Sequence, residues 1–396
     1  MRVCIFGSEI GPVKKGVFVG GATVSAVRLG QALHNLGDDI FVFSSAPRGR
    51  PSRVYSFDWG VIVNKRISGS YMSLPYLLLY GITSFFGLLH FCTQNKIETL
   101  SSHSGSMLLC VVPSVVGKIL RIPVVHTQYC ELSKKTDGFA NCFRIFIRNS
   151  YLFMPDRFVG ISKNVYNSLV NNGISCTKVV MIPPVIPVYT KCGRPLTRYR
   201  CTLGCNDSDL LALFVGNLKH NKGIDVLFRA FINLSKEIPN LKLIITTELV
   251  HKHLLNRKDS LNDMLAQHGL ADRVVWLGFV DDIISLLSEV DVVVVPFLNL
   301  NGISDYPLVV LEAMAVGTPV VATDVGGTSE VLCENVGVLV PSGDVNALSK
   351  GILDIIRDKS SFYCGNKFGF SLNGFGEDSV GQKYHSLFLE EVSKVD

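Results

Sequence analysis

Length, composition and charge exclude several classes of protein. The chain has 396 residues, 47% hydrophobic and 18% charged, which excludes a disordered or fibrous chain and predicts two or three domains with buried cores. The net charge of +5 conceals two unlike halves: residues 1–200 carry 23 Lys and Arg against 8 Asp and Glu, whereas residues 201–396 carry 15 against 25. Nucleic acid, an anionic membrane surface or a phosphorylated lipid would each suit the basic half.

The first half of the chain alternates short apolar runs with helical periodicity, which is typical of doubly wound α/β domains. A glycine-rich loop at residues 7–21 follows the first strand and precedes a helix over Ala22–Leu36. The strands of this half are expected at Val3–Phe6, Ile40–Ser44, Val61–Val63, Thr99–Ser102, Val124–His126 and, as the last one, Arg157–Ile161, with a helix at Lys163–Asn171 after it.

One long uncharged stretch raises the question of a membrane span. Residues 67–95 contain no Asp, Glu, Lys or Arg, and Tyr71–Cys92 has the length of a spanning helix. Pro75, Gly81 and Gly87 interrupt it, so a buried or interfacial helix of a soluble domain is favoured. We expect a cytoplasmic protein that binds peripherally to the inner face of a membrane, because no signal peptide is evident.

The 11 cysteines are interpreted mainly as reduced core residues of an intracellular protein. Cys192, Cys201 and Cys205 could contribute to a metal site. However, the chain has no C-x-x-C pair and no histidine near these cysteines at ligand spacing, so a zinc site is disfavoured.

A second α/β unit follows a proline-rich, basic stretch at Ile182–Arg200, which predicts a linker. Its strands are expected at Leu210–Val215, Leu241–Thr246, Val274–Leu277, Val292–Pro296, Pro319–Thr323 and Gly337–Val340, with helices at Gly223–Leu234 and, at the end, Glu377–Val395. The expected fold is therefore α/β, with two Rossmann-like domains facing each other across a cleft. The expected boundaries are 1–185 for the N-terminal domain, 186–206 for the linker, 207–375 for the C-terminal domain and 376–396 for a C-terminal helix that could return to the N-terminal domain.

The most informative block of sequence is Ser304–Leu332. Pro307 suits a helix start, and the helix expected over Leu308–Ala315 would direct its free N–H groups and positive dipole end at a diphosphate. Glu312 lies more than one turn into this apolar helix, where a carboxylate is costly unless it has donors such as ribose hydroxyls. A Glu312 turned to solvent is the alternative.

This block resembles the donor-binding signature of the family 4 retaining glycosyltransferases, which have the GT-B fold. The positions in register are Tyr306, Pro307, Glu312, Ala313, Met314, Ala315, Gly317, Pro319, Val320, Thr323, Gly326, Gly327 and Glu330. The resemblance implies that Glu312 binds the ribose of a nucleotide sugar and that the amides of Leu308 and Val309 face its diphosphate. The family's first Glu falls at Ser304 here; Asp305 could substitute after a one-residue shift, or Ser304 could make a weaker hydrogen bond.

Two further loops match the family less completely. In Phe214–Phe231, Lys222 and Gly223 match residues that hold the leaving diphosphate, whereas Asn217 replaces the usual Arg and Lys219 could restore its charge. In the N-terminal loop, Gly20 and Gly21 match a glycine pair beside the donor phosphate. Lys14 and Lys15 could meet an anionic acceptor, although solvated lysines are the plain alternative.

Two histidines are expected at strand ends that face the cleft. By the resemblance, His126 lies next to the reacting carbon and hydrogen-bonds the donor sugar, and His103 shapes the acceptor side. A structural role is the alternative for each. The predicted catalytic set is therefore His126, Lys222 and Glu312.

The resemblance implies transfer of a hexose from a nucleotide-diphosphate sugar to an acceptor hydroxyl, with retention of configuration. No cofactor and no metal are expected, because cationic side chains and a helix dipole can stabilise the leaving diphosphate. The basic half predicts a lipid-linked or membrane-proximal glycan acceptor and an anionic membrane surface, and no nucleic acid is expected since no nucleic-acid motif is present. The alternatives are a GT-B epimerase or phosphorylase, and a non-catalytic sugar-nucleotide-binding partner of another transferase.

Overall fold

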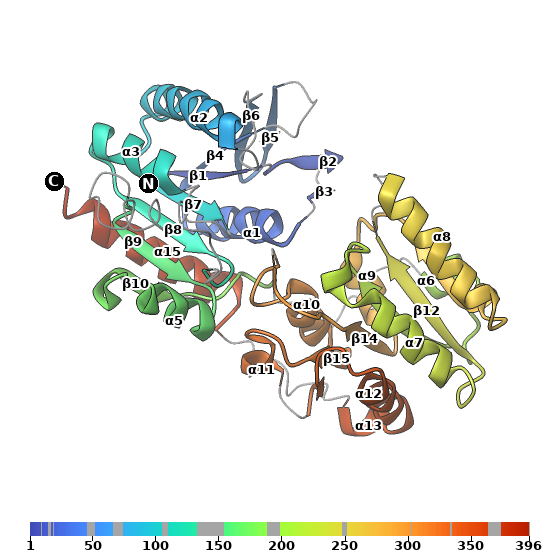
Figure 1. Ribbon diagram of the computed structural model, residues 1–396. Helices are drawn as coiled ribbons and strands as arrows, with labels where there is room; N and C mark the ends of the chain where they lie inside the picture. Colours follow the sequence, from blue (N-terminus) through green and yellow to red (C-terminus); the bar gives the residue numbers. More distant parts are fainter. Residues whose placement is uncertain are drawn as a thin grey trace. The chain divides into compact units, whose positions relative to one another are not determined.

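The protein folds into two compact α/β units (Figure 1). The structure is a computed structural model that describes residues 1–8, 10–14, 17–18, 20–45, 52–65, 74–104, 110–132, 154–187, 199–247, 252–301, 303–332, 335–362 and 374–395. Unit 1 comprises Met1–Pro187, Gly302–Asp305 and Gly374–Asp396, and unit 2 comprises Val188–Asn301 and Tyr306–Asn373.

Unit 1 is built on an eight-stranded sheet in the order β10-β9-β8-β7-β1-β4-β6-β5, in which only β5 and β6 pair antiparallel. Its strands are β1 (Arg2–Ser8), β4 (Asp39–Ser45), β5 (Arg53–Phe57), β6 (Gly60–Lys65), β7 (Thr99–Ser104), β8 (Val124–Gln128), β9 (Arg157–Gly160) and β10 (Val179–Met181), and a small ribbon is formed by β2 (Pro12–Lys14) and β3 (Val17–Phe18). Its helices are α1 (Gly21–Asn35), α2 (Leu74–Asn95), α3 (Val111–Leu120), α5 (Lys163–Asn171), η2 (Cys176–Lys178) and α15 (Glu377–Val392).

Both faces of this sheet are covered, as the apolar sequence of its central strand requires. Alternate residues of β1 point to opposite faces. Val3 and Ile5 belong to a core that they share with α1 and α15. Cys4 and Phe6 belong to a second core with α2 and α3. A continuous apolar run in β1 is therefore the consequence of burial on two sides.

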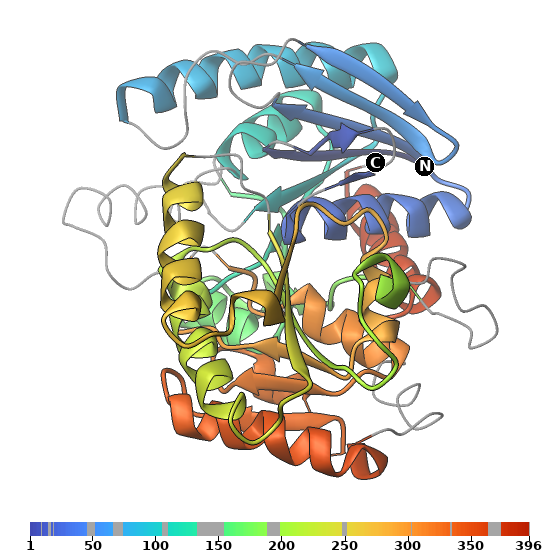
Figure 2. The same ribbon diagram turned by 90° about the vertical axis from the view of Figure 1, so that its right-hand side faces the viewer.

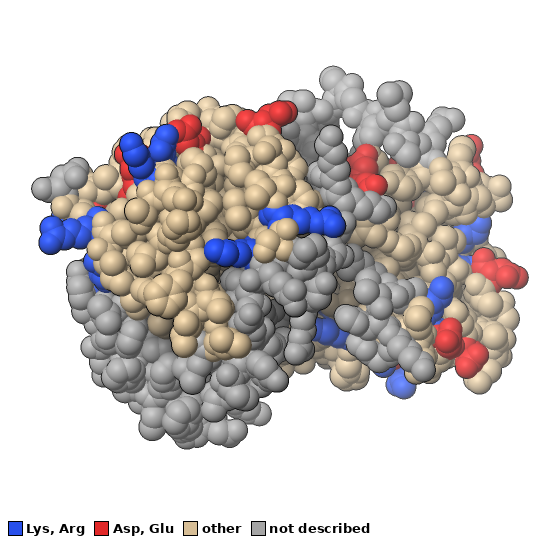
Figure 3. Space-filling view, turned by 90° about the horizontal axis from the view of Figure 1, so that it is seen from above, with Lys and Arg blue, Asp and Glu red and all other residues tan. Residues whose placement is uncertain are grey.

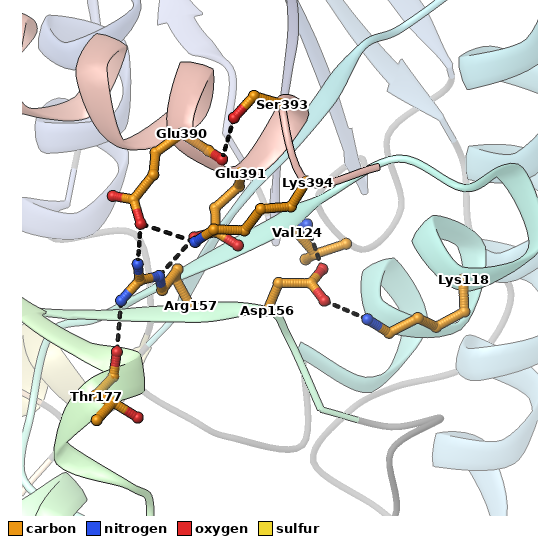
Figure 4. A network of polar contacts seen from close by, with 9 residues as sticks. All are labelled: Lys118, Val124, Asp156, Arg157, Thr177, Glu390, Glu391, Ser393 and Lys394. Atoms are coloured by element: carbon orange, nitrogen blue, oxygen red, sulfur yellow. Dashed lines mark hydrogen bonds and ion pairs between the residues drawn. The ribbon is translucent and has the colours of Figure 1, made fainter. Parts of the chain in front are cut away.

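The C-terminal helix α15 belongs to unit 1 and packs against α1, as Figures 1 and 2 show. The packing is close, since a Cβ on Gly381 would lie 3.2 Å from the Cβ of Ala32. Arg157 at the start of β9 pairs with both Glu390 and Glu391, with 2.6 Å between its Nε and the Glu391 Oε1 (Figure 4). Apolar packing and this paired guanidinium together hold α15 on the sheet of unit 1.

Unit 2 is built on a six-stranded parallel sheet in the order β13-β12-β11-β14-β15-β16. Its strands are β11 (Leu210–Val215), β12 (Leu241–Thr246), β13 (Val274–Leu277), β14 (Val292–Val295), β15 (Val320–Thr323) and β16 (Gly337–Val340). Its helices are α6 (Tyr199–Thr202), η3 (His220–Lys222), α7 (Ile224–Leu234), α8 (Lys252–Ala266), η4 (Ala271–Arg273), α9 (Ile283–Glu289), α10 (Leu308–Val316), α11 (Thr328–Val331), α12 (Val345–Arg357) and α13 (Lys359–Phe362).

The strand orders place a topological switch point in each sheet. In unit 1 the chain runs from β1 outward through β4 and then returns to β7 on the other side of β1. In unit 2 it runs from β11 through β12 and β13 and then returns to β14 on the other side of β11. Ligands of open α/β sheets bind outside the carboxyl ends of the strands at such points. The loops after β1, β7, β11 and β14 are therefore the candidate binding loops.

The predicted fold class is confirmed, and the structure adds the β2–β3 ribbon and two strands of the large sheet to the predicted set. β5 forms an antiparallel edge beside β6, and β10 follows α5, so Arg157–Ile161 is not the last strand of its half. β10 has three residues, too few for a pattern of burial to mark it in sequence. The predicted linker falls partly outside the described residues, which resume with α6.

The uncharged stretch forms α2 from Leu74 onward, and residues 67–73 lie outside the described residues. Searching the described helices finds none that is both long enough and apolar enough to cross a membrane. The favoured interpretation of this stretch as a helix of unit 1 agrees with the structure.

Candidate active site

The turn between β11 and α7 approaches the neighbouring strand so closely that it requires glycine. Gly223 caps α7 with φ of 70°, and a Cβ on it would lie 1.7 Å from the Pro296 carbonyl oxygen after β14. A side chain there would have to displace backbone. This contact fixes the position of Lys222, the residue just before the glycine.

Gly223→Ala is expected to destabilise unit 2 by at least about 3 kcal/mol, because left-handed backbone strain and backbone overlap add. Gly269→Ala is the matched control, since Gly269 has φ of 65° but nothing within 4 Å of its Cβ position; about 1 kcal/mol is expected there. The chain has two tryptophans, so urea unfolding in a Trp59→Phe background reports unit 2 through Trp276. Equal losses of unfolding free energy in the two variants would contradict the close approach of Gly223 to the Pro296 carbonyl.

Lys222 is a half-buried cation with no carboxylate partner among the described residues. Its Nζ lies 3.9 Å from the centroid of the Phe297 ring, a favourable cation–π distance. Burial, and secondly the charge of Lys219, lower the pKa of Lys222 from 10.5 to about 8. The ammonium is thus partly desolvated, which favours capture of an anion.

The loops after β11 and β14 hold each other in place. The Leu298 N–H donates to the Asn221 carbonyl at 2.9 Å, and the Asn221 side-chain amide donates to the Asn301 carbonyl at 2.9 Å. The carbonyl of Phe297 accepts from Thr323 Oγ1 at 2.7 Å. The platform beneath Lys222 is therefore set by hydrogen bonds between these two loops and from the end of β15.

The predicted helix over Leu308–Ala315 is α10, which the structure extends to Val316. Pro307 is its N-cap residue, and the Pro307 carbonyl accepts from the Val310 N–H. The N–H groups of Leu308 and Val309 have no acceptor within the helix, as in any first helical turn. Just before the helix, Tyr306 donates to Glu330 Oε2 at 2.7 Å, which joins two signature positions.

Glu312 is buried with 6% of its surface exposed, in the middle of α10. Its neighbours Leu311 and Ala313 are fully buried. The alternative of a Glu312 turned to solvent is therefore wrong. The family resemblance implies that this carboxylate accepts from ribose hydroxyls.

In unit 1, His126 lies in the middle of β8, which continues to Gln128, and not at the strand end as predicted; it has no exposed surface. Its Nδ1 lies 3.0 Å from Ser102 Oγ and its Nε2 lies 3.2 Å from Gln128 Oε1. Because the Gln128 amide nitrogen donates to the Cys130 carbonyl, its oxygen faces the ring. Nε2 therefore carries the hydrogen, and Nδ1 accepts from Ser102.

His103 lies on the adjacent strand β7 and is 5% exposed. Its Nε2 contacts Ser101 Oγ at 2.8 Å, and its Nδ1 contacts the Tyr129 hydroxyl at 2.9 Å. Burial, and secondly the charge of His126, lower the pKa of His103 to about 3. Burial also lowers the pKa of His126 to about 4, against a smaller opposing effect of Gln128. Both imidazoles are therefore neutral at physiological pH.

These two histidines are expected to make unit 1 acid-sensitive. Their folded-state pKa values lie below the ordinary 6.5, so the unfolded state binds protons first and stability falls as pH drops below 6.5. Between pH 6.5 and pH 5 each histidine should lower the free energy of unfolding of unit 1 by about 2 kcal/mol. Urea unfolding in a Trp276→Phe background, reported by Trp59, measures this loss. His126→Gln should remove about half of it, and an unchanged pH slope in that variant would contradict the assignment.

Asp305 and Ser304 belong to unit 1, whereas the other residues predicted in that block lie in unit 2. Asp305 is fully buried: its N–H donates to the Tyr129 carbonyl at 2.8 Å, and its carboxylate accepts from Ser162 Oγ. Ser162 also caps α5. Asp305 thus ties its segment to the ends of β8 and β9, a role unlike the donor-sugar contact predicted for it. Ser304 is half-buried.

The remaining predicted residues are divided between the units. Gly20 caps α1 with φ of 93°, and Gly21 is the first residue of that helix; both are exposed. Lys14 lies on β2, and Lys15 lies outside the described residues. The Asn217 side chain accepts from the Lys219 N–H at 3.2 Å, and Lys219 is exposed. Searching the described part of the chain finds no group of three His, Cys, Asp or Glu side chains that could hold a metal.

Sequence reasoning missed three residues that shape these environments: Phe297, Gln128 and Tyr129. Phe297 follows β14 at the switch point. Its place just after the apolar run Val292–Val295 could have marked it in the sequence as a residue of a binding loop. Gln128 follows His126 at the two-residue spacing that puts side chains on one face of a strand. Tyr129 had no such signal, because its contact with His103 spans 26 residues.

Comparisons with known proteins show the family of this chain. A family model described as glycosyltransferase family 4 matches residues 19–188, and one described as glycosyl transferases group 1 matches residues 198–365. An uncharacterised glycosyltransferase of Methanocaldococcus jannaschii is 35% identical over 163 residues, which is 40% of this chain and 39% of that protein.

Two further similarities extend over most of the chain. One component of the phosphatidylinositol N-acetylglucosaminyltransferase of Arabidopsis thaliana is 26% identical over 349 residues, 84% of this chain and 71% of that protein. The crystal structure of Anabaena HepE in complex with UDP-glucose has a TM-score of 0.76 at 16% identity, covering 98% of this chain and 100% of that one. The chain therefore belongs to the family 4 glycosyltransferases and has their GT-B fold, and at this general level it is a glycosyltransferase.

Proposed function

We propose that the protein transfers a hexose from a nucleotide-diphosphate sugar to an acceptor hydroxyl, with retention of the anomeric configuration. The observation that carries this proposal is the half-buried Lys222, which has no carboxylate partner among the described residues and lies over Phe297. It lies on the loop after β11, at the switch point of unit 2, and the loop after β14 leads into α10. Lys222 on the first loop and the N–H groups at the start of α10 after the second loop could therefore bind the same diphosphate.

The chemistry requires positive charge where the leaving diphosphate becomes more negative. Breaking the sugar–phosphate bond places charge on the phosphate oxygens, and preorganised cations and N–H groups stabilise that charge most in the transition state. Lys222, assisted by Lys219, supplies the cation, and the amides of Leu308 and Val309 supply donors. Glu312 accepts from the ribose hydroxyls. On this basis we expect transfer to persist in the presence of EDTA.

Retention is proposed to follow from attack on the face from which the diphosphate leaves. The leaving phosphate takes the proton of the acceptor hydroxyl, so the bond to carbon and the new O–H form as the sugar–phosphate bond breaks. His126 would bind a sugar hydroxyl through Nε2, which now donates to Gln128. NMR of the first-formed product tests this step, and an inverted anomeric centre would overturn it.

The donor is identified by screening. Thermal shift with UDP-, GDP- and ADP-sugars should single out one base, followed by measurement of sugar transfer with that donor. HepE was crystallised with UDP-glucose, which makes UDP-sugars the first choice. If no sugar nucleotide binds, the proposal fails.

The acceptor is proposed to be a lipid-linked or membrane-proximal glycan, met by a protein that is cytoplasmic and peripheral at the membrane. The excess of Lys and Arg in residues 1–200 suits such a surface, and the Arabidopsis relative is named for a phosphatidylinositol acceptor. His103, Lys14 and Lys15 are assigned to the acceptor side. Radiolabel from the donor should appear in the organic phase of membrane extracts; label confined to water-soluble products would contradict this assignment.

A further inference from the structure

Unit 1 has a hollow at the β5–β6 edge of its sheet, on the side away from β7 and β8 in the strand order. A cavity of about 310 Å³ lies between α2 and the edge strands β5 and β6. Its apolar lining comes from Phe43, Val54, Val63, Gly87 and Phe91. Gly87 opens this space, because a Cβ there would lie 2.9 Å from the Phe43 ring and 3.5 Å from the Lys65 Cδ.

The polar lining of this groove is cationic. Arg53, Lys65 and His90 line it together with Ser52, Asn64 and Gln94, and no Asp or Glu is among the described residues of the lining. Arg53, Lys65 and His90 are exposed and have no carboxylate partner in the part of the chain that the structure describes. An anion entering the groove would therefore meet two permanent cations and an imidazole, with no competing carboxylate.

An exposed apolar stripe runs along α2 beside the groove. Leu79, Ile82 and Phe86 follow the spacing of one helix face, and His90 continues that line into the groove. Ile82 is 54% exposed and Phe86 is 63% exposed; Val54 of the groove itself is 66% exposed. Figure 3 looks onto the side of unit 1 that carries α2 and shows a wide uncharged area with both Lys or Arg and Asp or Glu side chains at its margins.

This combination has a specific chemistry. Exposed apolar side chains in a row mark an interaction surface. An apolar row next to unpaired cations matches an anionic lipid, whose acyl chains meet the apolar row and whose headgroup meets the cations. A soluble anion would use the cations and leave the stripe exposed.

We propose that the groove between α2 and β5–β6 binds the phosphate of an anionic membrane lipid, while the stripe Leu79, Ile82 and Phe86 enters the acyl layer. This inference rests on the proposed membrane-borne acceptor and adds a lipid site at the β5–β6 edge of the sheet. It holds the protein on the membrane, and the headgroup in the groove is not the sugar acceptor.

The test is co-flotation of the full chain with vesicles at constant salt. Phosphatidylcholine vesicles containing phosphatidic acid are compared with ones containing phosphatidylglycerol at equal zeta potential, and with phosphatidylcholine alone. Wild-type protein should prefer phosphatidic acid at least tenfold over phosphatidylcholine and should prefer it over phosphatidylglycerol. Arg53→Ala/Lys65→Ala should lose about tenfold to thirtyfold in binding to phosphatidic acid.

The control removes the same charge elsewhere. Lys178→Ala/Lys236→Ala changes exposed lysines of η2, beside the opposite edge strand β10, and of unit 2; a loss below about threefold is expected. Gly87→Ala narrows the groove without changing charge and should weaken the preference for phosphatidic acid. Phe86→Ser should weaken binding to every vesicle. Trp59 fluorescence checks that unit 1 remains folded in each variant.

Several outcomes would overturn the proposal. These are equal losses in the two double variants, binding to both anionic lipids that is no tighter than binding to phosphatidylcholine alone, or complete release by 10 mM glycerol 3-phosphate, which would identify a soluble anion as the ligand. Sugar transfer measured in the same preparations separates the two proposals. If the protein transfers sugar but the groove variants float as well as wild type, only the lipid site in the groove is refuted. If the groove variants lose flotation but no sugar is transferred, only the proposed function is refuted.

Discussion

Replacing Lys222 with alanine is expected to lower kcat/KM for the sugar nucleotide about 10²- to 10³-fold, the effect typical of losing one preorganised donor to a developing negative charge. The loss should be large because the Lys222 ammonium is mostly buried and lies over the Phe297 ring, where solvent cannot replace it. Steady-state kinetics with the donor found by screening measures it. Lys219→Ala, which removes an exposed cation, should cost less than about tenfold.

The pH dependence makes this test more specific. Since the pKa of Lys222 is about 8 in the free protein, kcat/KM should fall about tenfold for each pH unit above 8 as the ammonium loses its proton. Lys222→Arg should remove this alkaline decline, because a guanidinium stays protonated. Lys219→Ala should move the decline to higher pH, because Lys219 lowers the pKa of Lys222. An alkaline limb unchanged in both variants would show that Lys222 does not bind the donor.

Replacing Glu312 with alanine is expected to lower kcat/KM for the donor about 10²-fold, if its carboxylate accepts from two ribose hydroxyls. Glu312→Gln keeps the size of the side chain and should lower kcat/KM for the donor about tenfold. Glu237→Gln, at a carboxylate that is 54% exposed and paired with Arg357, is the control and should have almost no effect.

A donor analogue identifies the partner of Glu312. With a donor that carries 2′,3′-dideoxyribose, kcat/KM of the wild-type protein should fall by most of the factor that Glu312→Ala loses with the normal donor. The Glu312→Ala variant should show little further loss of kcat/KM with this analogue, because both changes remove the same contact. Additive losses would mean that Glu312 acts on another part of the donor or only supports α10. A normal KM for the donor in Glu312→Ala would exclude the ribose role.

Much of the fold was predictable because burial on two faces leaves a periodic record. The apolar runs at Val3–Phe6 and Val292–Val295 mark central parallel strands, whose side chains meet helices on either side. The short edge elements left no such record. β5 alternates exposed with half-buried residues, and β10 has only three residues.

The residues of the candidate site divide in the same way. The structural positions of Lys222 and Glu312 could be predicted because they are set locally: one residue follows a strand and precedes the glycine that caps α7, and the other is a carboxylate on an apolar helix. Asp305 could not be placed, because its partners, Ser162 and the Tyr129 carbonyl, are more than 140 residues away. The hydrogen bonds of His103 and His126 likewise depend on the pairing of β7 with β8.

The amino-acid sequence alone was sufficient for the α/β class, the two-unit organisation and the family, because local patterns of polarity and turn residues encode them. The tertiary structure was needed for the strand order that creates the two switch points, and for the return of α15 to unit 1. It also established the burial that lowers the pKa of Lys222 and joined Arg53, Lys65 and the apolar stripe of α2 around one groove. These features come from contacts between distant segments, which no local pattern specifies.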